Sequence, residues 1–202
     1  MGNSFSKKRG KDNMNDKRYL NSQLHEVNID RAISTHDRIL DIGGGGEGII
    51  GKLYGKNVVS IDHISEELEE TNNESLKIVM RAENMAFLDD SFDHITLFFT
   101  LMYMDANTKE KVLKESFRVL RSGGKLKIWD INIPQYNGGE KDIFLAHLNI
   151  KLPEEAIRVS YGIKMNEEKH HMDIIKKYCG EIGFNPILQE VNGDVFYIDL
   201  VK

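Results

Sequence analysis

The order of apolar and polar positions predicts that strands and helices alternate from residue 38 onward. Short apolar runs, partly β-branched and bounded by turn residues, predict strands at residues 38–42, 57–62, 76–80, 94–99 and 125–130. Apolar residues at helical spacing predict helices at residues 47–53, 65–72, 108–120 and 167–182. Alternation with short connections is typical of an α/β domain.

A hairpin is predicted near the C-terminal end of the sequence. The apolar runs 187–191 and 195–201 flank Asn192-Gly193-Asp194. Asn-Gly supplies the positive φ angles that a tight primed turn requires. We therefore expect the sheet to end with an antiparallel strand.

Residues 132–166 interrupt the alternation. They hold two stretches in which every second residue is apolar, one from Leu148 to Leu152 and one from Ile157 to Ile163, joined across Pro153. This pattern predicts an inserted hairpin with one apolar face. Ligands of open α/β sheets bind outside the carboxyl ends of the strands, and the insertion leaves from one such end, so we expect it to cover that crevice. A dimer contact or a simple cover of the core is the alternative.

The first 35 residues divide into two parts. Residues 1–15 are polar and basic, and we expect a disordered tail because they cannot bury enough apolar surface. Residues 16–202 are expected to form the domain, and Leu20, Leu24 and Val27 lie near helical spacing, which predicts a helix from about residue 16 to residue 33. The first six residues match the pattern for N-terminal myristoylation at Gly2, but we expect no stable membrane association.

Composition and charge exclude several classes of protein. The chain has 202 residues and one cysteine, Cys179, so internal disulfides are excluded and a cytoplasmic location is expected. No apolar run is long enough for a membrane-spanning helix. The net charge is −5, and residues 1–19 carry +4, so the remainder carries −9. An acidic body argues against a nucleic-acid-binding face, which needs clustered Lys and Arg.

A glycine-rich turn provides the main chemical signal. The strand ending in Asp41-Ile42 runs into Gly43, Gly44, Gly45 and Gly46, and the next strand ends in Asp62, 19 residues after Gly43. This spacing is typical of a βαβ nucleoside site in which the second carboxylate accepts ribose hydroxyls. A carboxylate directly before the turn would repel a pyrophosphate but attract the ammonium and sulfonium of S-adenosylmethionine. Asp41 therefore favours a methyl donor over a dinucleotide.

Four segments in order resemble motifs of the class I S-adenosylmethionine-dependent methyltransferases, and of the branch that methylates small molecules. They lie at residues 40–45, 59–62, 82–93 and 117–126. The resemblance implies a Rossmann-like α/β fold with a seven-stranded sheet, mostly parallel with an antiparallel C-terminal strand, and helices on both faces. It also implies S-adenosylmethionine as the cofactor and a small-molecule acceptor.

The resemblance places the methionine end of the cofactor on Asp41 and the glycines, the ribose on Asp62, and the adenine edge on residues 82–84. Two positions depart from the family pattern: Arg81 stands where an Asp is usual, and Glu47 stands at the third family glycine. The expected cofactor-binding residues are Asp41, Gly43, Gly44, Gly45, Gly46, Asp62, His63, Ala82, Glu83, Asn84 and Thr100.

The methyl acceptor is expected where the fourth and fifth strands end. Methyl transfer is an in-line displacement, so alignment and exclusion of water matter more than covalent catalysis. No catalytic residue can be assigned, and Tyr103 and Asp130 are the candidates for a base. His170 and His171 are adjacent on a predicted helix and diverge, with Glu167 placed to pair with His171, so no metal site is expected.

Other functions stay open. A protein that binds the cofactor without turnover, in a regulatory role, is one alternative, and a dinucleotide-dependent oxidoreductase is a second. Methylation of RNA or protein is disfavoured by the acidic body and by the absence of an Asn-Pro-Pro-Tyr-type sequence near Phe98. A homodimer is compatible with the inserted hairpin.

Overall fold

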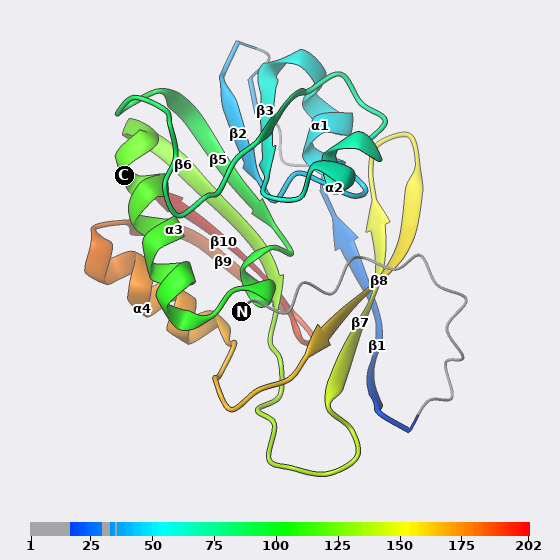
Figure 1. Cartoon of the computed structure of the whole chain (residues 1–202). Coiled ribbons are helices and arrows are strands. Elements are labelled where there is room, and N and C mark those ends of the chain that lie inside the picture. Colours follow the sequence, from blue (N-terminus) through cyan, green and yellow to red (C-terminus); the bar gives the residue numbers. More distant parts are fainter. Residues whose placement is uncertain (1–16, 30–32, 35) are drawn as a thin grey trace.

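A computed structural model of the chain describes residues 17–29, 33–34 and 36–202 (Figure 1). The expected tail at residues 1–15 and the myristoylation pattern at Gly2 lie outside the described residues.

The main sheet has seven strands in the order β4-β3-β2-β5-β6-β10-β9. The strands β4, β3, β2, β5 and β6 are mutually parallel, and β10 is antiparallel to both of its neighbours. Their bounds are β2 Ile39–Ile42, β3 Val58–Asp62, β4 Leu76–Val79, β5 Phe92–Phe98, β6 Leu120–Ile131, β9 Asn185–Asn192 and β10 Val195–Val201. The Rossmann-like α/β sheet and the C-terminal hairpin predicted from the sequence are confirmed.

The two longer helices cover one face of this sheet, and α1 (Ile49–Tyr54) packs in the apolar cluster of the opposite face. α3 (Ala106–Val119) and α4 (Met172–Ile182) pack against buried residues of β5, β6 and β10 in one apolar cluster. Asp105 begins α3 by accepting a hydrogen bond from Thr108 N at 2.7 Å, and Gly183 ends α4 with φ 121°. The shorter helices are α1 after β2 and α2 (Ser65–Glu69) after β3, with 3₁₀ turns at Gly55–Asn57 and Leu101–Tyr103.

A separate three-stranded sheet lies beside the main sheet on the side away from α3 and α4 (Figure 1). It consists of β1 (Tyr19–Asn28), β7 (Ile143–Lys151) and β8 (Ala156–Lys164), in the order β1-β7-β8. β7 and β8 form the hairpin that the alternating pattern predicted, and they pair antiparallel from Ile143 opposite Lys164 to Lys151 opposite Ala156. We call β1, β7 and β8 the cap sheet.

The helix predicted for residues 16–33 is wrong, because residues 19–28 form β1. β1 pairs in parallel with β7, more than 100 residues later in the chain. Leu24, which gave the helical spacing, is 52% exposed and has no place in the core. His25 and Val27 are buried on either side of exposed Glu26, a period of two that matches a strand.

The apolar face of the cap sheet is buried within the chain. Phe144, Ala146, Leu148 and Ile150 of β7 belong to one cluster with residues of the main sheet and of α1. The cap sheet and α1 thus cover the face of the main sheet opposite α3 and α4, where the resemblance implied helices. Within the described ranges, no helix combines the length and the apolar character that a membrane span requires.

Candidate functional site

The glycine turn joins β2 to α1 in a conformation that side chains would obstruct. Gly43 N and Gly44 N both donate to Ile61 O, at 2.8 and 3.1 Å, which ties the turn to the end of β3. Gly43 has φ 72°, and a Cβ there would lie 2.5 Å from the side chain of Thr100. Glycine is therefore required both for the backbone angle and for the close approach of β5.

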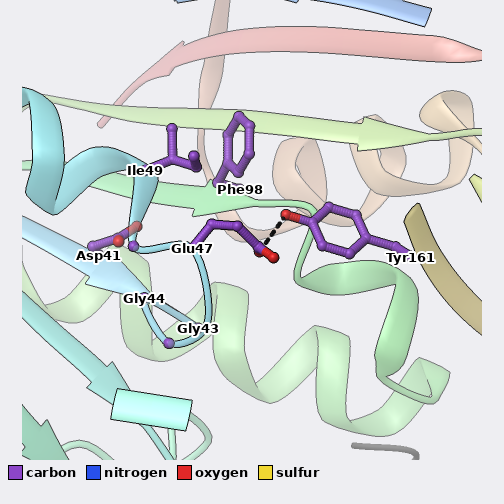
Figure 2. Close-up of a pocket in the computed structure, with 9 residues that line it drawn as sticks. Asp41, Gly43, Gly44, Glu47, Ile49, Phe98 and Tyr161 are labelled. Carbon is purple, nitrogen blue, oxygen red and sulfur yellow. Dashed lines mark hydrogen bonds between the residues drawn. The ribbon is translucent and has the colours of Figure 1, made fainter. Parts of the chain in front are cut away.

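A pocket opens above this turn (Figure 2). It and its mouth hold about 230 Å³ of empty space. Five elements meet here: β2, the turn, α1, β5 and the cap strand β8. The pocket is lined by Asp41, Gly43, Gly44, Gly45, Glu47, Gly48, Ile49, Phe98 and Tyr161.

Asp41 is the expected site residue that is placed best for a cationic ligand. Its side chain lines the pocket although the residue is only 2% exposed. Thr96 on β5 donates its hydroxyl to Asp41 Oδ1 at 2.8 Å, which fixes the carboxylate. Burial of a charge is costly unless it is hydrogen-bonded or meets an opposite charge, so this carboxylate is suited to a cation.

Glu47 and Tyr161 meet across the pocket. The Tyr161 hydroxyl donates to Glu47 Oε2 at 2.9 Å (Figure 2). Burial first, and then the charge of Glu47, raise the pKa of Tyr161, so the phenol stays a donor. The ring centroids of Tyr161 and Phe99 are 5.8 Å apart, and those of Phe98 and Trp129 are 5.9 Å apart. One wall of the site is therefore aromatic.

Asp62 and His63 lie at the end of β3, next to the turn. Asp62 Oδ1 accepts a hydrogen bond from Ile64 N at 3.1 Å, and Asp62 Oδ2 would be 2.9 Å from a Cβ at Gly45. His63 Nδ1 is 3.4 Å from Asp62 Oδ1, and its side chain is 57% exposed. The carboxylate thus faces the glycine turn, and neither Asp62 nor His63 lines the pocket described above.

The loop after β4 brings Glu83 close to this end. Arg81 binds the Glu83 carboxylate with its guanidinium. Partial burial would raise the pKa of Glu83, but backbone hydrogen bonding, Arg81 and the nearby His63 outweigh it, so the pKa is lowered. Arg81, which departs from the family pattern, therefore forms an ion pair with Glu83, one of the residues expected at the adenine edge.

Ala82 and Asn84 belong to the same loop, which α3 holds from behind. Arg118 of α3 donates to Met85 O at 2.9 Å and to Phe87 O at 2.8 Å, while Glu115 accepts from Met85 N at 2.8 Å. Arg118 and Glu115 are not among the site residues predicted from the sequence. Their helical spacing of three residues was the available signal, because it pairs them on one face of α3.

Two further expected residues support the turn without lining the pocket. The Thr100 hydroxyl is 3.1 Å from both Ile42 O and Phe98 O, so it joins the ends of β2 and β5. Gly46 N donates to Glu67 O at 2.8 Å, which ties the turn to α2. Glu47, Gly48, Ile49, Phe98 and Tyr161 line the pocket and were not predicted to do so.

The two candidate bases lie near the ends of β5 and β6. Asp130 is fully buried, and its oxygens accept from Met102 N at 3.2 Å, Ile131 N at 2.8 Å and His170 Nε2 at 3.1 Å. Tyr103 is 42% exposed, and burial of part of its surface together with the charge of Asp130 raises its pKa. The hydrogen bonds of Asp130 thus link the segment after β5, β6 and the residues before α4. The raised pKa of Tyr103 keeps its phenol protonated.

The histidines at the start of α4 differ from the prediction. The helix begins at Met172, not at residue 167, so Glu167 and His171 do not share a helix face. His171 Nδ1 instead accepts from Asp173 N at 3.3 Å, and His170 binds Asp130. Among the described residues, no group of three or more His, Cys, Asp or Glu side chains is arranged to hold a metal ion.

Large parts of this chain are similar in sequence to known proteins. The model of a methyltransferase domain matches residues 40–128. A ubiquinone/menaquinone biosynthesis C-methyltransferase of Proteus mirabilis is 30% identical over 175 residues, which cover 77% of this chain and 69% of that protein. A protein of the same description from Vibrio vulnificus is 30% identical over 136 residues, 58% of this chain, so the match spans half of that relative's length.

Solved structures share the fold. A structure described as a methyltransferase dependent on S-adenosylmethionine, from Methanosarcina mazei, superposes with a TM-score of 0.58 at 21% identity, and covers 84% of this chain and 94% of that one. A 1,6-didemethyltoxoflavin-N1-methyltransferase of Burkholderia thailandensis, solved with S-adenosylhomocysteine, gives 0.51 at 11% identity, covering 82% of this chain and 71% of that one. The sequence match to the Proteus protein and the shared fold lead to one conclusion: this chain belongs to the class I S-adenosylmethionine-dependent methyltransferases.

Proposed function

We propose that the protein binds S-adenosylmethionine and transfers its methyl group to a small molecule by in-line displacement. The observation that carries this proposal is the Asp41 carboxylate, 2% exposed and fixed by Thr96, which lines a pocket above a glycine turn. A buried carboxylate there attracts a sulfonium and an ammonium and repels a pyrophosphate. The same feature argues against a dinucleotide-dependent oxidoreductase.

In this proposal the cofactor lies along the carboxyl ends of β2, β3 and β5. The methionine end occupies the pocket beside Asp41 and the glycines, Asp62 receives the ribose hydroxyls, and the loop of Ala82 and Asn84 supports adenine. Because Arg81 engages Glu83, we propose that backbone groups or Asn84 contact the adenine amino group. His63 and Thr100 then border the site, His63 from solvent and Thr100 from behind the turn.

The chemistry requires alignment more than proton transfer. The attacking atom of the acceptor forms a bond to the methyl carbon as the carbon–sulfur bond breaks, and sulfur keeps the electron pair as a neutral thioether. Any proton that the acceptor then carries passes to water. We propose no catalytic base: Asp130 already accepts three hydrogen bonds, and the raised pKa of Tyr103 opposes its acting as one.

The acceptor would enter under the cap sheet. Phe98 and Tyr161 line the pocket, and Phe99 packs against Tyr161. Such walls favour a flat, apolar acceptor, which agrees in kind with the quinone-pathway description of the relatives. We therefore propose that residues 132–166, together with β1, form the cap of a single domain over residues 16–202. The apolar face of this cap is used within the chain, which favours a cap over a dimer contact.

Calorimetric titration tests the proposal. S-adenosylmethionine or S-adenosylhomocysteine should bind the wild-type chain, and Asp62→Ala should weaken binding about tenfold or more. Glu140→Ala, which removes an exposed carboxylate of the loop before β7, should bind as the wild type does. Tight binding of NADH with no response to either sulfur ligand would refute the proposal.

Transfer of a labelled methyl group to a metabolite extract would separate an enzyme from a regulatory binding protein. We also propose that nucleic acid is not the acceptor, because the residues after the first 19 carry −9.

A further inference from the structure

Glu47 adds a charge to the pocket at a place where the family pattern has a glycine. It lies in the turn between Gly46 and Gly48, and its carboxylate points across the pocket to Tyr161 of the cap sheet (Figure 2). Among the described residues that line the pocket, Asp41 and Glu47 are charged, and both are acidic. The pocket therefore offers two negative charges to one end of the cofactor.

Other carboxylates reinforce this field. A Cβ at Gly45 would lie 2.6 Å from Glu67 Cβ and 2.9 Å from Asp62 Oδ2, so both side chains reach the same turn. Lys52 of α1, the basic residue on the neighbouring helix, is engaged with Glu155 in the turn between β7 and β8, at 3.4 Å. That lysine is not among the pocket residues.

The donor and its product differ by one positive charge. S-adenosylmethionine carries an ammonium, a sulfonium and a carboxylate, for a net charge of +1, whereas the thioether product is neutral overall. We propose that Glu47 makes the site selective for the sulfonium form over the thioether, so that loss of the charge on methyl transfer weakens binding and favours release of the product. This inference rests on the function proposed above.

Tyr161 couples this selectivity to the cap sheet. Its hydroxyl fixes one oxygen of Glu47 and leaves the charge inside the pocket. Unit charges a few ångströms apart in a partly solvated site interact strongly enough to change a dissociation constant about tenfold, which corresponds to about 1.4 kcal/mol. A selectivity of this size is measurable by direct titration.

The test compares the dissociation constants of S-adenosylmethionine and S-adenosylhomocysteine. The wild-type chain should prefer the sulfonium by about tenfold, and Glu47→Gln, which keeps the shape and can still accept from Tyr161, should reduce the preference to about twofold or less by weakening only the sulfonium. Glu155→Gln removes a carboxylate from the adjacent turn and should keep the wild-type ratio. An unchanged ratio in Glu47→Gln would overturn the inference, as would an equal change in Glu155→Gln.

A second measurement needs no variant, and so it stands even if Glu47→Gln fails to fold. An analogue with an ammonium group in place of the sulfonium should bind the wild-type chain about as tightly as the donor. Equal affinity for this analogue and for the thioether would overturn the inference while leaving the proposed function intact. Failure of the wild-type chain to bind the donor and the thioether would refute the proposed function itself, and this inference with it.

Discussion

Replacing Arg118 by Met should loosen the loop that is proposed to hold adenine. Arg118 donates to the carbonyls of Met85 and Phe87 and to the carboxylates of Glu115 and Asp89. Methionine keeps much of the aliphatic length of arginine and removes all of these donors. The backbone of a buried residue, Met85, would then lose one of the two side chains that pair with it.

The expected loss in the free energy of unfolding is worked out from the hydrogen bonds of Arg118 to the carbonyls of Met85 and Phe87. A hydrogen bond from a charged donor is worth about 1.5–3 kcal/mol, and less where water can replace it. The Arg118 side chain is 31% exposed, so about 1 kcal/mol for each carbonyl is reasonable. The salt bridge to Asp89, which is 72% exposed, adds little. We expect a loss of about 2 kcal/mol in the free energy of unfolding, or about 4–8 °C in Tm for a chain of this size.

Urea unfolding followed by the fluorescence of the single tryptophan, Trp129, measures this loss, because that residue is 4% exposed in the folded chain. Arg121→Met is a matched control, since the ion pair of Arg121 is with Asp93, at 2.6 Å, and not with the loop. It should cost less than half as much. If both variants unfold at the same urea concentration, the loop is not held as we describe.

The ion pair between Arg118 and Glu115 predicts that the stability difference between wild type and Arg118→Met depends on pH. The hydrogen bond from Arg118 is the largest cause of the lowered pKa of Glu115. A carboxylate with a lowered folded-state pKa stabilises the protein above its ordinary pKa and loses this contribution as pH falls through the lowered value. The difference in stability between wild type and Arg118→Met should therefore shrink below about pH 4.5, as urea titrations at a series of pH values would show. A constant difference from pH 6 to pH 3 would contradict this origin.

Three further substitutions and one chemical modification give expected outcomes. Thr96→Val removes the hydroxyl that donates to buried Asp41 and should cost about 1–3 kcal/mol in urea unfolding, together with donor affinity. Gly44→Ala should also lower the free energy of unfolding, because the new methyl group would lie 2.6 Å from Asp41 Oδ2. In Gly180→Ala, within α4, the new methyl group meets nothing within 4 Å, so this change should raise the free energy of unfolding by about 0.5–1 kcal/mol. Burial raises the pKa of Cys179 to about 12, so iodoacetamide at pH 8 should alkylate it only in urea, as mass spectrometry would report.

The glycine turn and the two carboxylates beside it could be predicted from the sequence because their signals are local. Asp62 ends β3 and Asp41 is the last residue but one of β2, and parallel neighbouring strands bring their carboxyl ends to one edge of the sheet. The glycines directly follow the first of these strands, so one short segment determines both the turn and the charge beside it. A β-strand and a turn can be inferred from a few consecutive residues, and this part of the site needs little else.

β1 could not be predicted in the same way. Its residues alternate only from His25 onward, and a register shift between Asn21 and Leu24 breaks the period of two before that point. Its hydrogen-bond partners lie in β7, and nothing within residues 16–33 indicates them. A strand that is paired only by a distant segment leaves no local signal beyond propensity, and tertiary context then decides.

The contact between Glu47 and Tyr161 shows why the side of the pocket that faces the cap sheet is harder to predict. Tyr161 was visible in the sequence as one apolar position in an alternating stripe, and Glu47 as an irregular glycine motif. Each position taken alone is typical of ordinary core packing or of a turn. Only the packing of the cap sheet on the turn brings the Tyr161 phenol to the Glu47 carboxylate. The pairing of Glu47 with Tyr161 is thus one that no short stretch of the sequence indicates. The proposed selectivity for donor over product therefore depends on the inserted segment as well as on the turn.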